Sequence, residues 1–295
     1  MDGDGWLELA TANYHGNSVT VLAPNPTALL VEDPAGSGIR SGGGRGNLWG
    51  SGDVDYWSFS GRAGEWLVVG SETPGHLVNS GLYWRVERPD GVVLDGFYPQ
   101  NNGTGQLAPV QLPMSGTYTV RVSWWHGYTG EYRVRVTVAG APWQTEGEDN
   151  NTVAQANVAG FERDGSVQRA QVLGYIRYGD PGDVFRLGNL SPATDIRLAY
   201  DRPDSSGLTG IIEVLDAAGV VVAAGAAGST HLSYVVPPGQ AGLYCARLRG
   251  QSGSDGLFSQ YLLTIELTAL TAPFGVGDTL PVEGRGVPGR LSRVT

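Results

Sequence analysis

The sequence contains no lysine, so all 19 basic residues are arginine, and 29 aspartates and glutamates outnumber them. The formal net charge is −10 and the isoelectric point is about 4.8. Proteins that bind nucleic acid or anionic membranes need basic surfaces that neutralise phosphate, so this charge balance argues against both partners. It is better suited to binding divalent cations. We attribute the missing lysine to the coding bias of a GC-rich bacterial genome.

Cysteine and long apolar runs are also scarce. The single cysteine, Cys245, excludes an internal disulfide framework, and its place in the alternating run Gly242–Leu248 predicts a thiol buried in a strand. No window approaches the roughly 18 consecutive apolar residues that a membrane helix requires. The longest run of small apolar residues, Val220–Ala227, is interrupted by Gly225. We therefore expect no membrane insertion.

Glycine and proline are abundant, with 46 and 17 copies against two methionines. Valine, threonine and aromatic residues supply much of the apolar content. This composition indicates many short strands joined by tight turns, as in an all-β protein. The chain of 295 residues is too long for one small domain, and a prior of about 150 residues per domain predicts two.

An internal repeat supports that count. The segment GDVDYWSF at Gly52–Phe59 returns in degenerate form as GDPGDVFRL at Gly179–Leu187. The matched pairs, 126 to 129 residues apart, are Asp55 and Asp183, Gly91 and Gly219, Tyr118 and Tyr244, and Tyr132 and Tyr261. Because side chains alternate along a strand, Asp53, Asp55, Trp57 and Phe59 share one face. We expect the acids at the mouth of the strand and the aromatics in the core.

Turn signals at RPDG and PMSG divide the first repeat into strands at the spacing of a sandwich. The predicted strands are Asp55–Ser60, Glu65–Ser71, Gly81–Glu87, Val92–Phe97, Gly105–Leu112, Gly116–Ser123 and Gly130–Val138. The glycine-rich residues 23–50 are predicted to be loop and linker, and residues 140–151 the linker to the second repeat. The predicted fold is all-β, with two tandem antiparallel, jelly-roll-like β-sandwich domains and extra terminal strands.

Residues 30–139 and 146–268 each resemble the bacterial pre-peptidase C-terminal (PPC-like) domain. The resemblance rests on the acidic strand GDVDYWSF, on the leading segment GEDNNTVAQAN, and on the strands GTYTVRV and GEYRVRVTV with their later counterparts. The family implies a small β-sandwich attached to secreted peptidases and to long cell-surface proteins. The first copy has a glycine-rich run where the family has an Asn-containing segment at the entry to the domain. In the second, Pro181 and Gly182 widen the acid pair.

The two ends carry different patterns. Residues 1–24 combine an acidic DGDG turn with LELATAN and a closing strand at Ser18–Leu22, and they resemble a partial FG-GAP, or VCBS, repeat of a propeller blade. Residues 272–295 are similar to the start of an Ig-like module of large bacterial surface proteins. Both ends resemble interrupted modules, so we expect a fragment of a longer array. Met1 is followed by acidic residues rather than by a basic region and an apolar run, so the pattern of a signal peptide is not expected here.

Three acidic groups are candidate calcium sites, because calcium takes about six to eight hard oxygen ligands. The groups are Asp2, Asp4 and Glu8; Glu148, Asn150 and Asp183; and Glu32, Asp53 and Asp55. In the second group, a divalent ion would hold an acidic linker against a strand and fix the angle between the sandwiches. The alternative is that all these acids cap turns and solvate an acidic surface.

A second candidate site is the aromatic tip SWWHGYTG, with Trp124, Trp125 and Tyr128. Adjacent tryptophans point to opposite faces of a strand, so one is expected to be exposed unless another module covers it. An exposed indole is suited to stacking on a sugar ring or a protein partner. The alternative is that the tryptophans form a lid on the sandwich or an interdomain contact.

Motifs for catalysis are missing: there is no G-x-S-x-G and no H-E-x-x-H, and the four histidines are far apart in sequence. We therefore expect a non-catalytic, extracellular or cell-surface bacterial protein for adhesion or for matrix or filament structure, stabilised by calcium. The alternatives are an accessory C-terminal region of a secreted peptidase and a carbohydrate-binding module. The expected partners are other protein modules, self-association through terminal strands, or a polysaccharide.

Overall fold

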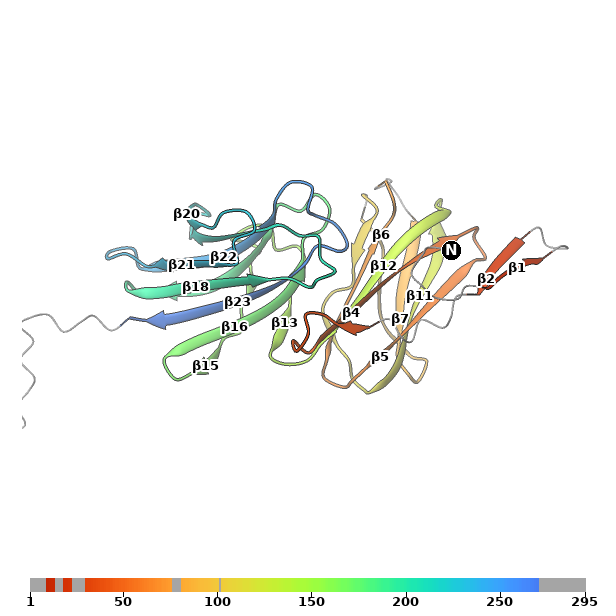
Figure 1. Cartoon of the computed structure of the whole chain (residues 1–295), viewed down its shortest axis with the longest axis horizontal. Coiled ribbons are helices and arrows are strands. Elements are labelled where there is room, and N and C mark those ends of the chain that lie inside the picture. The colour runs from red at the N-terminus through yellow and green to blue at the C-terminus, as the bar shows by residue number, and fades with distance from the viewer. Residues whose placement is uncertain (1–8, 14–17, 23–29, 76–80, 101, 271–295) are drawn as a thin grey trace, which may run out of the picture.

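The computed structural model describes residues 9–13, 18–22, 30–75, 81–100 and 102–270. These residues contain strands, turns and bends but no helix, which confirms the predicted all-β class. None of them belongs to a helix long and apolar enough to cross a membrane. Figure 1 shows two β-sandwiches side by side along the long axis, the first in orange to yellow-green and the second in green to blue.

The first sandwich is formed by residues 31–139. Its larger sheet, in the order β10-β6-β12-β4-β3 with β9 also on β6, contains β3 (Val31–Glu32), β4 (Ile39–Leu48), β6 (Trp66–Glu72), β9 (Thr104–Gln106), β10 (Val110–Gln111) and β12 (Gly130–Ala139). The facing sheet, in the order β5-β11-β7-β8, contains β5 (Val54–Gly61), β7 (Gly81–Glu87), β8 (Val93–Phe97) and β11 (Gly116–His126).

The second sandwich is formed by residues 143–269. One sheet, in the order β13-β16-β23-β18-β21 with β15 also on β16, contains β13 (Trp143–Thr145), β15 (Glu162–Asp164), β16 (Val167–Tyr175), β18 (Thr194–Asp201), β21 (His231–Val235) and β23 (Gln260–Ala269). The other, in the order β14-β17-β22-β19-β20, contains β14 (Asn157–Val158), β17 (Asp183–Leu190), β19 (Gly210–Asp216), β20 (Val221–Ala224) and β22 (Gly242–Gly250).

The two sandwiches share one topology. In the first, β12 lies between β4 and β6, and in the second β23 lies between β16 and β18. The facing sheets agree as well, since β5-β11-β7-β8 corresponds to β17-β22-β19-β20. Alternate residues of the central strands point inward, as Tyr118, Val120 and Val122 of β11 do. The sequence repeat is therefore a repeat of structure.

The prediction that residues 23–50 are loop and linker is wrong for β4, which pairs with β12 along its whole length. Its glycines are needed because other residues occupy the space above them. An ideal Cβ on Gly44 would lie 2.2 Å from the Trp57 ring, and one on Gly43 would lie 2.6 Å from Phe258. A side chain at Gly44 would push the two sheets of the first sandwich apart, and one at Gly43 would push against the second sandwich.

The predicted linker 140–151 also contains a strand, because β13 pairs in parallel with β16 and joins the second sandwich. At the start of the chain, β1 (Leu9–Asn13) and β2 (Ser18–Leu22) form an antiparallel pair, at the positions expected for LELATAN and the closing strand. The predicted Ig-like segment 272–295 lies outside the described residues.

The two sandwiches are in contact. Ile39 and Ala139 of the first pack with Trp143, Leu173 and Leu262 in one buried cluster. Hydrogen bonds between the two sandwiches surround this cluster. They are Arg135 Nη1 to Leu257 O at 2.6 Å, Leu257 N to Glu72 Oε2 at 3.0 Å, and Gln260 Nε2 to Thr137 Oγ1 at 2.9 Å. The interface therefore has an apolar centre bordered by hydrogen bonds between the two sandwiches.

Candidate metal centre

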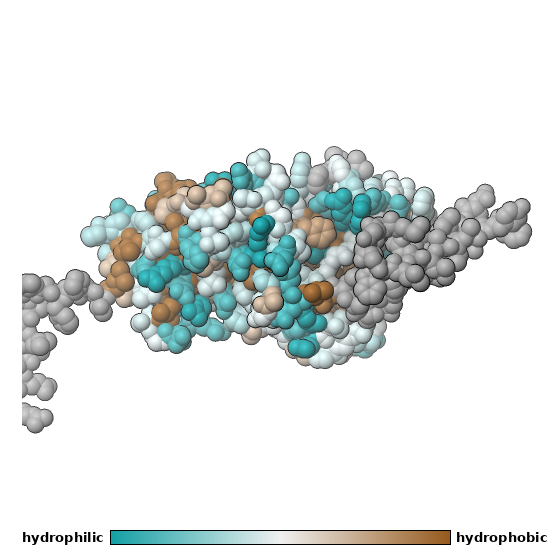
Figure 2. All heavy atoms as spheres, viewed as in Figure 1, coloured by the Kyte–Doolittle hydropathy of each residue, from teal (hydrophilic) through white to brown (hydrophobic). Residues whose placement is uncertain are grey.

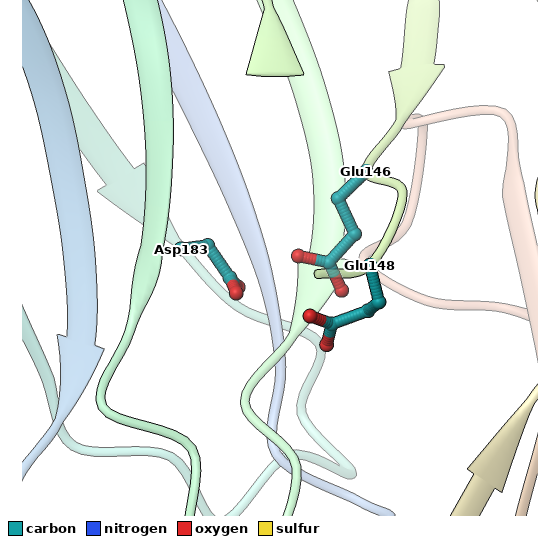
Figure 3. Close-up of side chains that lie close together, drawn as sticks. All are labelled: Glu146, Glu148 and Asp183. Atoms are coloured by element: carbon teal, nitrogen blue, oxygen red, sulfur yellow. The ribbon is translucent and has the colours of Figure 1, made fainter. Parts of the chain in front are cut away.

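Three carboxylates gather at one end of the second sandwich. Glu146 and Glu148 follow β13, and Asp183 begins β17. One oxygen of each lies within 4.8 Å of an oxygen of the others, and Figure 3 shows both glutamates on the side that faces Asp183. Glu146 and Asp183 are almost completely buried. Within the described residues, no other three His, Cys, Asp or Glu side chains meet that distance.

The backbone explains how residues from distant segments meet. Glu146 N donates to Leu173 O at 3.1 Å, and Val184 N donates to Asn150 O at 3.0 Å. Residues 146–150 therefore run from β16 to β17 across the end of the sandwich. The preceding turn bends at Gly182, whose φ of +121° disfavours other residues. That turn brings Asp180 beside Asp183, where Asp180 Oδ1 accepts Gly182 N at 2.8 Å.

Tyr261 of β23 holds two of the carboxylates together. Its hydroxyl lies 2.9 Å from Glu146 Oε2 and 2.7 Å from Asp183 Oδ2. The other oxygen of Glu146 accepts Tyr175 N at 2.8 Å. The hydroxyl reaches this position because the neighbouring strand carries Gly174, where an ideal Cβ would lie 2.3 Å from the Tyr261 oxygen.

Several buried oxygens at this site have no hydrogen-bond partner. They are both carboxylate oxygens of Glu148 and one oxygen each of Asn150, Asp180 and Asp183. Native proteins leave few buried polar atoms unsatisfied, and a bound ion or an ordered water often accounts for those that remain. Here the unsatisfied atoms are all oxygens that accept hydrogen bonds, from carboxylate groups and one amide. They need a cation or several donors to compensate their burial.

Arg177 supplies part of that compensation. Its Nε lies 2.7 Å from Glu148 Oε1 and 3.7 Å from Asp180 Oδ2, and its Nη2 lies 3.3 Å from Asp149 Oδ1. The contact with Glu148 is an ion pair whose N–H is not aligned for a hydrogen bond. Glu146, Glu148, Asp180 and Asp183 bring four carboxyl groups together, and the single guanidinium that contacts two of them leaves an excess of negative charge.

This excess of negative charge contributes to raised pKa values of the carboxyl groups. Burial, followed by the charges of Glu146 and Asp180, raises the pKa of Glu148 to about 9. Burial, followed by the neighbouring carboxylates, also raises the pKa of Asp183 well above its usual range. Such shifts mean that the ionised group is disfavoured until protons or a cation neutralise it.

The ligand chemistry indicates which cation fits. All the donors are carboxylate, amide or phenol oxygens, with no histidine or cysteine among them, which suits calcium or magnesium rather than zinc or copper. Magnesium keeps a rigid octahedral shell with several waters, whereas calcium accepts many protein oxygens in a flexible arrangement. The residues present therefore fit calcium, and Glu146, Glu148, Asn150, Asp180 and Asp183 are the residues that would hold it.

The structure does not bring the third predicted group together. Glu32 Oε1 accepts Gly38 N, and Asp53 Oδ2 accepts Trp49 N, as turn-capping acids do. Asp55 Oδ2 accepts Tyr132 Oη at 2.6 Å. The first predicted group, Asp2, Asp4 and Glu8, lies outside the described residues.

The structure brings the second predicted group, Glu148, Asn150 and Asp183, to one place and adds three residues that the sequence did not indicate, Glu146, Asp180 and Tyr261. The sequence does contain a pattern that indicates Glu146. Glu146, Glu148 and Asn150 alternate, so an extended segment points all three to one side. Tyr261 was recognised only as a repeat anchor, because nothing in its local sequence shows that its hydroxyl faces two carboxylates.

The predicted aromatic tip is only partly exposed. Trp124 is half-buried, and Tyr128 packs against the core of the first sandwich while its hydroxyl donates to Glu131 O at 2.5 Å. Trp125 is 57% exposed, as one of two adjacent tryptophans was expected to be. Cys245 is buried in β22, as its alternating sequence predicts.

No protein-family model matches the chain, and no curated protein sequence matches it. Among solved structures, it is similar to PliG of Aeromonas hydrophila, a periplasmic inhibitor of g-type lysozyme, at 17% identity over 37% of this chain and 94% of that one, with a TM-score of 0.26. It is also similar to a tandem CBM22 domain from Paenibacillus barcinonensis, at 11% identity over 90% and 92%, with a TM-score of 0.24.

Tandem CBM51 modules of a Streptococcus pneumoniae family 98 glycoside hydrolase match at 11% identity over 88% of each chain, with a TM-score of 0.22. These neighbours include periplasmic and carbohydrate-binding proteins. Identities and TM-scores this low carry no argument about what the chain binds. Its ligands have to be inferred from its own residues.

Proposed function

We propose that this chain is a non-catalytic, extracellular part of a bacterial cell-surface or matrix protein, and that its second sandwich binds calcium. The observation that carries the calcium proposal is the set of buried, unpartnered oxygens around Asp183. A buried group with this charge is unfavourable without a cation. Calcium outside the cell is abundant enough to occupy sites of millimolar affinity, which is typical of extracellular modules.

Bound calcium would act as a structural cross-link. Its ligands come from residues 146–150 and from the turn 180–183, which are far apart in sequence and separated by β16. An ion between them fixes the segment that connects the two sandwiches. Glu146 accepts Tyr175 N, and the ring of Tyr175 lies 4.0 Å below the guanidinium of Arg135 from the first sandwich. The ion would therefore stabilise the interface as well as the second sandwich.

Thermal unfolding tests the proposal. We expect the Tm to rise with millimolar calcium and to fall with chelator, because a ligand that binds only the folded state stabilises it by about 2.7 kcal/mol at a hundredfold excess over Kd. Asp183→Asn should blunt the response, and calorimetry should show a heat of calcium binding that this variant loses.

The repeat offers a matched control. Asp55 is the counterpart of Asp183 in the first sandwich and also accepts a tyrosine hydroxyl. Asp55→Asn should therefore leave the calcium response intact. A Tm that calcium leaves unchanged, together with no heat of binding, would show that the acids serve only as turn caps and that packing alone positions the segment.

A further inference from the structure

Three aromatic side chains form a cluster on the outer face of the first sandwich. Tyr83 comes from β7, Tyr98 follows β8, and Trp125 comes from the end of β11. The rings of Tyr83 and Tyr98 stack with centroids 4.7 Å apart, and Trp125 is 5.1 Å from Tyr98 and 6.5 Å from Tyr83. Tyr98 and Trp125 are 49% and 57% exposed. We call these three residues the aromatic platform.

Strand alternation explains why the platform faces outward. Leu82, Trp84 and Val86 of β7 are buried in the core, so Tyr83 points to the opposite face. Ser123 of β11 pairs with Tyr83, and the strand is irregular between Trp124 and His126, where the ring of Trp125 reaches Tyr83 and Tyr98. Tyr98 and Trp125 are exposed beside the partly buried Tyr83, and exposing adjacent aromatic rings to water is unfavourable, so the platform is a candidate contact surface.

The core does not require the platform. Phe97 already covers Trp84 from β8, with the two rings stacked 5.8 Å apart. Neither Tyr98 nor Trp125 belongs to the buried cluster of the first sandwich. The platform therefore lies outside the core of the first sandwich. Figure 2 shows one face of the molecule, on which hydrophilic residues of intermediate or strong polarity predominate among the described ones.

We propose that the aromatic platform binds a neutral, β-linked polysaccharide. The axial C–H groups of such a pyranose ring carry partial positive charge and match the negative face of an aromatic ring, while the sugar hydroxyls stay in water. The neighbouring charges Arg85 and Glu87 form an ion pair at 2.5 Å and so compensate each other. A net charge of −10 disfavours acidic polysaccharides.

The size of the platform favours a sugar chain over a protein. A standard protein interface takes about 20–30 residues on each side. The platform has three, and its strand neighbours on the same face, Ser123 and the Arg85–Glu87 pair, are polar. The platform lies on the first sandwich and the metal centre on the second, so sugar binding does not depend on calcium.

Affinity electrophoresis of the full chain tests this inference. Native gels containing hydroxyethyl cellulose, laminarin or galactomannan should retard the protein in at least one case, and alginate gels should not. Removing one ring should weaken binding about tenfold or more, as loss of a stacking side chain does for nucleobases. We therefore expect Trp125→Ala and Tyr98→Ala to migrate close to their positions in a gel without polysaccharide.

Tyr56→Ala is the matched control, because Tyr56 is exposed on β5 of the same sheet but does not belong to the platform. It should keep the wild-type retardation, and so should Asp183→Asn, whose change lies in the other sandwich. Thermal unfolding of each variant establishes that it is folded. Free migration of the wild type in every neutral gel, or equal retardation of wild type and Trp125→Ala, would overturn the proposal.

Discussion

Tyr132 and Tyr261 occupy equivalent positions in the two sandwiches, and each hydroxyl contacts the aspartate of the opposite sheet, Asp55 or Asp183. Each also lies above a glycine of the neighbouring strand. The difference is the second partner of the hydroxyl. In the first sandwich it accepts Trp57 Nε1 at 2.9 Å, whereas in the second it lies 2.9 Å from Glu146 Oε2. One repeated arrangement therefore supports a core contact in one half and a candidate ion site in the other.

Replacing these tyrosines by phenylalanine should separate the two roles. Tyr261→Phe removes the donor that positions Glu146 and Asp183, so we expect weaker calcium binding in a calorimetric titration. Tyr132→Phe leaves Asp55 without its donor, and the loss of a buried hydrogen bond to a carboxylate costs about 1.5–3 kcal/mol of unfolding free energy. Its calcium affinity should equal that of the wild type. Equal calcium affinities for both variants would mean that Tyr261 has no part in the site.

At the scale of elements, strands with clear alternation and turn signals could be predicted from sequence. The strand Gly81–Glu87 was predicted with its observed bounds, and Gly130–Val138 differs from the observed strand by one residue. The glycine-rich β4 was missed because its sequence has the composition of a loop. What makes it a strand is tertiary: Trp57, Tyr132 and Phe258, distant in sequence, fill the space that its side chains would occupy. Local propensity contains no such information.

Single substitutions in β4 should show that its glycines are required. Gly44→Ala places a Cβ about 2.2 Å from Trp57, and overpacking of this kind typically costs about 1–3 kcal/mol. Gly52→Ala, where a Cβ would meet nothing within 4 Å, should change stability by less than about 0.5 kcal/mol. Urea unfolding of both variants measures the difference. Equal midpoints would mean that the sheets can move apart at β4 without cost.

At the scale of the whole molecule, the sandwiches are joined by more than the connecting segment. The sequence predicts two domains and an acidic linker, but it could not predict their contact, because the interface residues do not cluster in sequence. Arg135 is an example. It is completely buried, burial lowers its pKa to about 10, and its guanidinium lies over Tyr175 and donates to Leu257 O. We expect this interface, with its buried charge and shared apolar cluster, to couple the unfolding of the two sandwiches.

We therefore expect the chain to unfold in one calorimetric transition, with a van't Hoff enthalpy close to the calorimetric one. Arg135→Met should split this transition in two, because it removes a charged hydrogen bond and leaves the buried Leu257 carbonyl without its donor, which costs about 1.5–3 kcal/mol at the interface. Arg45→Met, which breaks the exposed pair with Glu131, should keep one transition because surface ion pairs contribute about 0–1 kcal/mol. Two transitions in the wild type would mean that the sandwiches unfold independently, and one transition in both variants would mean that Arg135 is not needed to couple them.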